Sequence, residues 1–219
     1  MYLTREIIEL LKKDLLLEWR QKYAIGGILL YVISTVFIVF IVSVDIPKAI
    51  WNILFWIICL FASVNAIVKS FVQENGGRQL YYYQLAHPIA ILLSKIIYNI
   101  LLLFFLITLT YIAMTVVYES PVVKQTLFWL ILLLGSIGFS ITFTFVSAIA
   151  AKADNSATLM AILSFPVVIP VLGTLLGLSN NALGLMHKSN YTDEVLILLA
   201  IDGLLLGMAI ILFPFLWKD

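Results

Sequence analysis

Six apolar runs, each about 20 residues long, constrain most strongly what this chain can fold into. They cover approximately residues 24–44, 50–68, 96–117, 127–151, 157–178 and 195–217. A bilayer core of roughly 30 Å is crossed by about 20 helical residues, so each run can span a membrane. Lipid offers no partner for a free backbone amide, and no run alternates in polarity as a barrel strand would. The sequence therefore predicts an all-α membrane protein with six transmembrane helices in one domain, residues 1–219.

The composition agrees with lipid as the solvent. Apolar residues make up 63% of the chain and charged residues 11%, with a mean hydropathy of +1.11. A net charge of +1 gives no reason to expect nucleic acid as a partner. Cys59 is the single cysteine, so a disulfide framework and a multi-cysteine metal site are excluded, and we expect it to pack in the interior. The charged first twenty residues do not resemble a cleavable signal peptide.

The distribution of lysine and arginine predicts the orientation. Ten of the 13 fall on one side of the predicted spans, and Lys48, Lys124 and Lys188 fall on the other. Because positive charge is retained in the cytoplasm, both chain ends are expected there. The ten are Arg5, Lys12, Lys13, Arg20, Lys22, Lys69, Arg78, Lys95, Lys152 and Lys218.

Residues 1–23 form a predicted amphipathic helix. Ile8, Leu11, Leu15 and Trp19 recur at helical spacing, and basic residues occupy mostly other directions. Such a helix would lie along the membrane surface, in contact with lipid. The alternative is a cytoplasmic helix packed on the rest of the protein.

The longest polar insertion, residues 69–95, is the predicted cytoplasmic coupling loop. Gly76 and Gly77 interrupt any helix that continues from the second span, and Pro88 ends or redirects one arriving from Leu80. A short helix is expected between them. The tyrosines at 81–83 favour a protein docking surface, and the alternative is an interfacial aromatic belt.

Small residues in the spans predict close helix packing within the chain rather than a dimer interface. They are Ser136, Ser140 and Thr144 on the fourth span and two GxxxG pairs, Gly173 with Gly177 and Gly203 with Gly207.

Four other residues in the spans carry separate predictions. Pro166 and Pro170 should bend the fifth span, as a hinge or as a static kink. Asp202, in the middle of the sixth span, is expected to line a polar cavity or to pair with Ser, Thr or Asn on another helix. Asn99, near the start of the third span, is expected to satisfy a helix end.

Catalytic chemistry has little support in the sequence. No phosphate-binding GxxxxGK motif occurs, so any ATP must be bound by another chain. His87 and His187 are predicted on opposite sides of the membrane, so they cannot jointly hold a metal or a haem. We therefore expect a protein without catalytic residues or a metal site, and no residue can be assigned to a bound cofactor.

Glu74, Gly76, Gly77, Leu80, Pro88 and Lys95, together with Gly138, Phe139 and the SFPVVIP stretch at 164–170, resemble membrane subunits of ABC-2-type transporters. More narrowly, the whole chain is similar to the haem exporter protein B, or cytochrome c maturation protein B, family. Many relatives carry Gly, a small residue, Leu and Glu in this loop, whereas here Arg78 follows Gly77.

The resemblance implies a six-helix, type V exporter-like permease subunit in a bacterial inner membrane. It also implies a cytoplasmic ABC ATPase and other cytochrome c maturation membrane subunits as partners, with haem as the species transported or handled. The ATPase would then act on the loop, through Glu74, Gly76, Gly77, Arg78, Leu80, Tyr82 and Leu85. The rival interpretation is a secondary transporter or a membrane-embedded enzyme that uses no ATPase.

Overall fold

The computed structural model describes residues 2–20, 22–42, 45–72, 87–150, 156–186 and 191–218, and every element in those ranges is a helix. Two of them precede the long spans, α1 (Tyr2–Arg20) and α2 (Lys22–Val42). The others are α3 (Lys48–Val72), α5 (Pro88–Val117), α6 (Gln125–Ala150), α7 (Ser156–Ala182) and α8 (Thr192–Lys218).

Five of these helices are long and apolar enough to cross a membrane. Their spanning segments are Lys48–Ile67, Pro88–Val117, Gln125–Ala150, Thr158–Ala182 and Thr192–Phe215. In α2 the corresponding apolar stretch, Gly26–Val42, is shorter. The prediction of an all-α membrane protein is confirmed for the described residues, and the sixth span stays a prediction.

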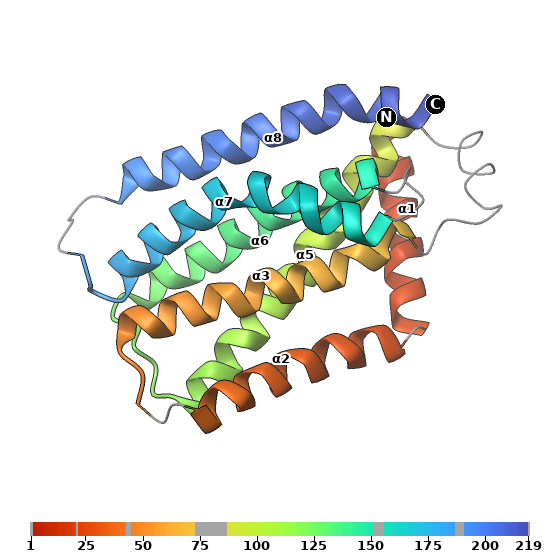
Figure 1. Cartoon of the computed structure of the whole chain (residues 1–219). Helices are drawn as coiled ribbons and strands as arrows, with labels where there is room; N and C mark the ends of the chain where they lie inside the picture. Colours follow the sequence, from red (N-terminus) through yellow and green to blue (C-terminus); the bar gives the residue numbers. More distant parts are fainter. Residues whose placement is uncertain are drawn as a thin grey trace.

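The long helices lie side by side with alternating direction, and α1 crosses one end of the bundle (Figure 1). Both chain ends lie at that end, which we call the α1 end. The opposite end carries the connections from α2 to α3, α5 to α6 and α7 to α8. Antiparallel neighbours follow from short connections, because a few residues can only join helix ends on the same side.

Helix α6 is the centre of the bundle, with 83% of its spanning window buried. Ser136, Ser140 and Thr144 are fully buried there, which confirms the prediction that they serve close packing. Gly135 belongs to the same helix and lies under Trp56 of α3. Small side chains let neighbouring helices approach on several sides at once.

The corresponding prediction for the two GxxxG pairs is wrong. A Cβ added at Gly173, Gly177, Gly203 or Gly207 would meet nothing within 4 Å. These glycines therefore lie on faces of α7 and α8 that no described helix covers. The four-residue spacing showed that the two glycines of each pair share one face of their helix, but it did not show in which direction that face points.

The predicted boundaries of the coupling loop also need correction. Helix α3 continues to Val72, and α5 already begins at Pro88, so residues 88–95 are helical. Proline is well suited to the first turn of a helix, where its missing N–H has no partner to lose. Lys95 consequently lies inside α5 and does not open it.

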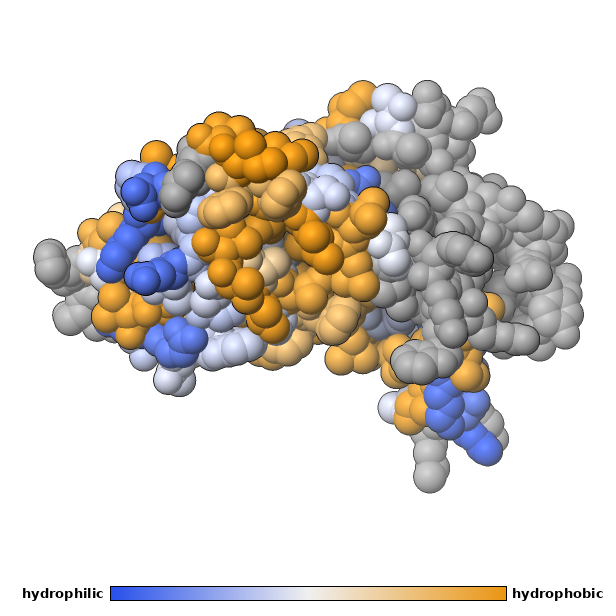
Figure 2. All heavy atoms as spheres, turned by 90° about the horizontal axis from the view of Figure 1, so that it is seen from below, coloured by the Kyte–Doolittle hydropathy of each residue, from blue (hydrophilic) through white to orange (hydrophobic). Residues whose placement is uncertain are grey.

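The surface carries many apolar side chains, as expected of a protein surrounded by lipid. Leu30, Val42 and Val116 are 69%, 78% and 80% exposed. In Figure 2 the apolar residues dominate the middle of the visible face, and hydrophilic residues gather toward the left, the end opposite α1, and in a second group at the lower right. In water such a surface would associate with itself.

Candidate functional site

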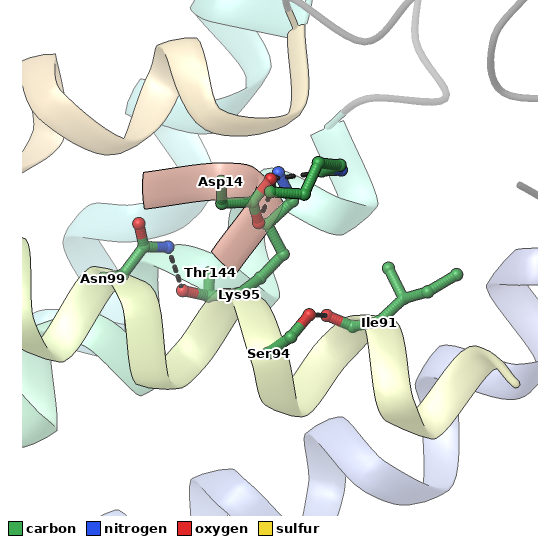
Figure 3. Close-up of polar contacts among 7 residues, drawn as sticks. Asp14, Ile91, Ser94, Lys95, Asn99 and Thr144 are labelled. Carbon is green, nitrogen blue, oxygen red and sulfur yellow. Dashed lines mark hydrogen bonds and ion pairs between the residues drawn. The ribbon is translucent and has the colours of Figure 1, made fainter. Parts of the chain in front are cut away.

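A buried ion pair joins α1 to α5 at the α1 end of the bundle (Figure 3). Asp14 Oδ2 lies 3.5 Å from Lys95 Nζ, and both side chains are 6% exposed. Lys13 Nζ lies 3.1 Å from the other carboxylate oxygen, Asp14 Oδ1. Charges buried in this way must be paired, because an isolated ion would cost several kcal/mol. We call Lys13, Asp14 and Lys95 the junction cluster.

A second contact joins the two helices where α5 begins. The backbone N–H of His87 donates a hydrogen bond to Glu6 Oε2 of α1 at 3.4 Å. A carboxylate is favoured near a helix N-terminus, where backbone N–H groups have no partner of their own. His87 itself is exposed. Helix α1 therefore holds the first two turns of α5 immediately after residues 73–86.

The same part of α5 is bound to the bundle centre. Ser140 Oγ of α6 donates to the backbone carbonyl of Ile96 at 2.8 Å. Asn99 Nδ2 donates to Thr144 Oγ1 of α6, also at 2.8 Å (Figure 3). Asn99 thus does not satisfy a helix end, and that prediction is wrong because α5 starts well before it.

The predicted ATPase-coupling residues lie outside the described residues. They are Glu74, Gly76, Gly77, Arg78, Leu80, Tyr82 and Leu85. His187 also falls outside the described ranges. The structure does place the two helix ends that flank this segment. The end of α3 and the start of α5 both lie at the α1 end (Figure 1).

Pro166 and Pro170 lie within α7 and are both exposed. Each removes one backbone donor from the helix. Thr174 Oγ1 donates to the carbonyls of Pro170 at 3.1 Å and Val171 at 2.8 Å. The helix runs from Ser156 to Ala182 with both prolines inside it, and whether it acts as a hinge stays a prediction.

Polar side chains at the end opposite α1 form contacts that the sequence analysis missed. Asn52 Nδ2 of α3 donates to Asn180 Oδ1 of α7 at 2.9 Å, and Trp56 Nε1 donates to Ser179 Oγ at 2.8 Å. Lys124 Nζ, before α6, donates to Asn181 Oδ1 at 2.9 Å. The SNN triplet at 179–181 was the available signal, but its partners lie more than 50 residues away in the chain.

Asp202 lies on α8 and is 4% exposed. Neither carboxylate oxygen has a hydrogen-bond partner among the described residues, so the expected pairing with Ser, Thr or Asn is not present there. Cys59 is fully buried, as expected. Within the described ranges, no group of three His, Cys, Asp or Glu side chains could hold a metal ion.

Comparison with known proteins identifies one family. The family model described as CcmB protein matches residues 5–216, which is nearly the whole chain. No curated protein and no solved structure matches it significantly. The match includes all five spanning helices, the junction cluster and Asp202. The chain therefore belongs to the CcmB family, the haem exporter protein B family of cytochrome c maturation.

Proposed function

We propose that this chain is the permease subunit of an ABC transporter that acts in haem delivery for cytochrome c maturation, driven by a separate cytoplasmic ATPase. The observation that carries the proposal is the CcmB family match over residues 5–216. Five membrane-spanning helices supply the permease body. Haem is the species transported or handled, and the other membrane subunits of cytochrome c maturation are further partners.

The geometry at the α1 end supports a path for the coupling. The ATPase would press on residues 73–86, the segment between α3 and α5, with Glu74, Gly76, Gly77, Arg78, Leu80, Tyr82 and Leu85 as the contact residues. Force applied there reaches the first turns of α5, which are bound to α1 through Asp14 and to α6 through Ser140. Packed helices with few alternative arrangements transmit such force as a rigid displacement.

Helix α1 lies on the cytoplasmic surface of the membrane in this proposal. It crosses the bundle end rather than running along it (Figure 1). Ile8, Leu15 and Leu16 are 51%, 44% and 64% exposed, although one side of the helix packs on α5. Exposed Arg5 and Lys12 lie on the same helix. Apolar side chains in the headgroup region, with basic ones near anionic lipid, suit this position.

Co-purification tests the coupling. The full chain is expressed together with a candidate ABC ATPase partner, and Tyr82→Asp and Leu85→Asp are compared with Tyr191→Asp at the opposite end, where Tyr191 is 38% exposed. We expect the first two variants to lose the ATPase and cytochrome c yield, because a buried charge would disrupt an apolar interface. Normal ATPase recovery and yield in both would contradict the proposal.

Cysteine accessibility tests the orientation. Arg78→Cys should react with a membrane-impermeant maleimide only after the cells are permeabilised, whereas Thr126→Cys should react in intact cells. Thr126 is exposed at the start of α6, at the end opposite α1. Reaction of Arg78→Cys in intact cells would reverse the assigned orientation. Cys59 is buried and should give little background.

A further inference from the structure

Asp202 occupies a notch in the centre of the bundle. If Gly138 of α6 carried a Cβ, that atom would lie 2.8 Å from Asp202 Oδ1, 3.4 Å from Oδ2 and 2.8 Å from Val171 Cγ1 of α7. The carboxyl group of α8 thus lies directly against the α6 backbone, at a point that α7 also reaches. Any other residue would place its Cβ inside contact distance, so the Asp202 carboxyl group and the Val171 side chain would have to shift.

No described helix around this notch supplies a counter-charge. Helices α5, α6 and α7 pack against α8, and α6 and α7 contain no Asp, Glu, Lys, Arg or His. The titratable residues of α5 are Lys95, which pairs with Asp14, and Tyr98 and Tyr111. No group within hydrogen-bond distance donates to either oxygen of Asp202 among the described residues.

In this environment the free-energy cost of burial differs strongly between the ionised and the protonated form of the carboxyl group. An ionised carboxylate that is 4% exposed and unpaired would cost several kcal/mol, and a neutral carboxylic acid costs much less. Charged residues elsewhere on α8, Asp193, Glu194 and Lys218, lie at its two ends and cannot neutralise its middle. Binding of a proton therefore removes most of the free-energy cost of burying this carboxyl group in the packed arrangement.

We propose that Asp202 is an intramembrane proton-binding site, occupied while α8 packs on Gly138 and vacated when α8 moves away from α6 and water reaches the carboxylate. The proton is taken from water as an O–H bond forms on the carboxylate, and it returns to water when the helices separate. Protonation is thus linked to packing, so acidification favours the packed arrangement and alkaline pH favours separation. This inference does not depend on the transported species or on the ATPase.

Infrared spectroscopy of the purified full chain in lipid nanodiscs tests the occupancy. We expect the difference spectrum of wild type minus Asp202→Asn at neutral pH to contain a carboxylic-acid C=O band. An ordinary aspartate, with a pKa of about 3.9, would be ionised there and would contribute only carboxylate bands. A difference spectrum that holds carboxylate bands alone would overturn the proposal.

The glycine notch supplies a matched pair of variants. Gly138→Ala should lower the pH at which the acid band disappears, because its Cβ displaces the carboxyl group from its pocket. Gly203→Ala, next to Asp202 in the sequence, adds a Cβ with nothing within 4 Å and should leave the band unchanged. Equal spectra for the two variants would show that the notch does not set the protonation state.

Hydrogen exchange tests the linkage to packing. Because Asp202→Asn is neutral at every pH, the rate of α8 exchange in wild type relative to this variant should rise as the pH increases. The comparison at equal pH removes the intrinsic pH dependence of exchange. A constant ratio across the series would refute the linkage, even if the acid band is present.

Discussion

Replacing Asp14 by alanine should release α1 from α5. The substitution leaves Lys95, whose side chain is 6% exposed, without the carboxylate that lies 3.5 Å from its ammonium group. Breaking a buried pair by removing one partner costs about 3–5 kcal/mol. Lys13 is 27% exposed and recovers hydration when Asp14 is lost, so the lower end of that range, about 3 kcal/mol, is expected.

A matched exposed pair on the same helix provides the control. Lys12 Nζ lies 3.3 Å from Glu9 Oε1, with side chains 62% and 66% exposed. Exposed pairs three or four residues apart on a helix contribute roughly 0.2–0.5 kcal/mol, so Glu9→Gln should change stability by no more than that. The two pairs have similar distances and differ in burial, which isolates the effect of solvent.

The assay combines thermal unfolding in detergent with alkylation of a cysteine placed at Leu10, which packs against the core. In Asp14→Ala the alkylation rate should rise strongly and the unfolding temperature should fall, whereas Glu9→Gln should change neither. Adding Lys95→Met to Asp14→Ala should recover part of the loss, since the buried ammonium group that lost its carboxylate partner is then removed as well. Equal effects of Asp14→Ala and Glu9→Gln, or no recovery in the double variant, would refute the reasoning.

Three further predictions use the same unfolding assay. Gly135→Ala should destabilise by about 1–3 kcal/mol, because its Cβ would lie 2.8 Å from Trp56 Cη2, whereas Gly173→Ala, with nothing within 4 Å, should be neutral or stabilising. Equal effects of the two would contradict the helix packing. Trp56→Phe should lower the free energy of unfolding by about 1–2 kcal/mol, because the hydrogen bond to Ser179 is lost. If the pair exists, adding Ser179→Ala to Trp56→Phe should lower it no further. Asn99→Leu should lower the unfolding temperature by removing the bond to Thr144, and an unchanged temperature would show that this bond contributes nothing.

Much of the fold could be predicted because lipid imposes a simple rule on the sequence. Long apolar runs must become helices, since no water is present to bind free backbone groups. Four of the five confirmed spans, those in α3, α6, α7 and α8, begin within a few residues of their predicted starts. The start of α5 was predicted eight residues late, because Lys95 was taken as the edge of the membrane segment when it is a buried residue paired with Asp14.

The candidate site was less accessible to sequence reasoning, because its members are far apart in the chain. Asp14 and Lys95 are each ordinary charged residues until α1 folds across the bundle end. Asn52 and Asn180 are likewise separated by 128 positions. The residue pattern within one helix carries no information about such a partner, because the identity of the partner depends on which helices become neighbours.

The sequence by itself determined the solvent and most of the secondary structure, because both follow from the order of residues along single helices. It also determined the family, because the family motifs are read along the chain. Only the tertiary structure decided what each polar or small residue faces. Gly138 and Gly173 look alike in the sequence, yet one accommodates Asp202 and the other faces away from every described helix. The physical reason is that helix propensity and hydropathy are local, whereas the rotation of a helix about its axis is set by its packing against neighbours.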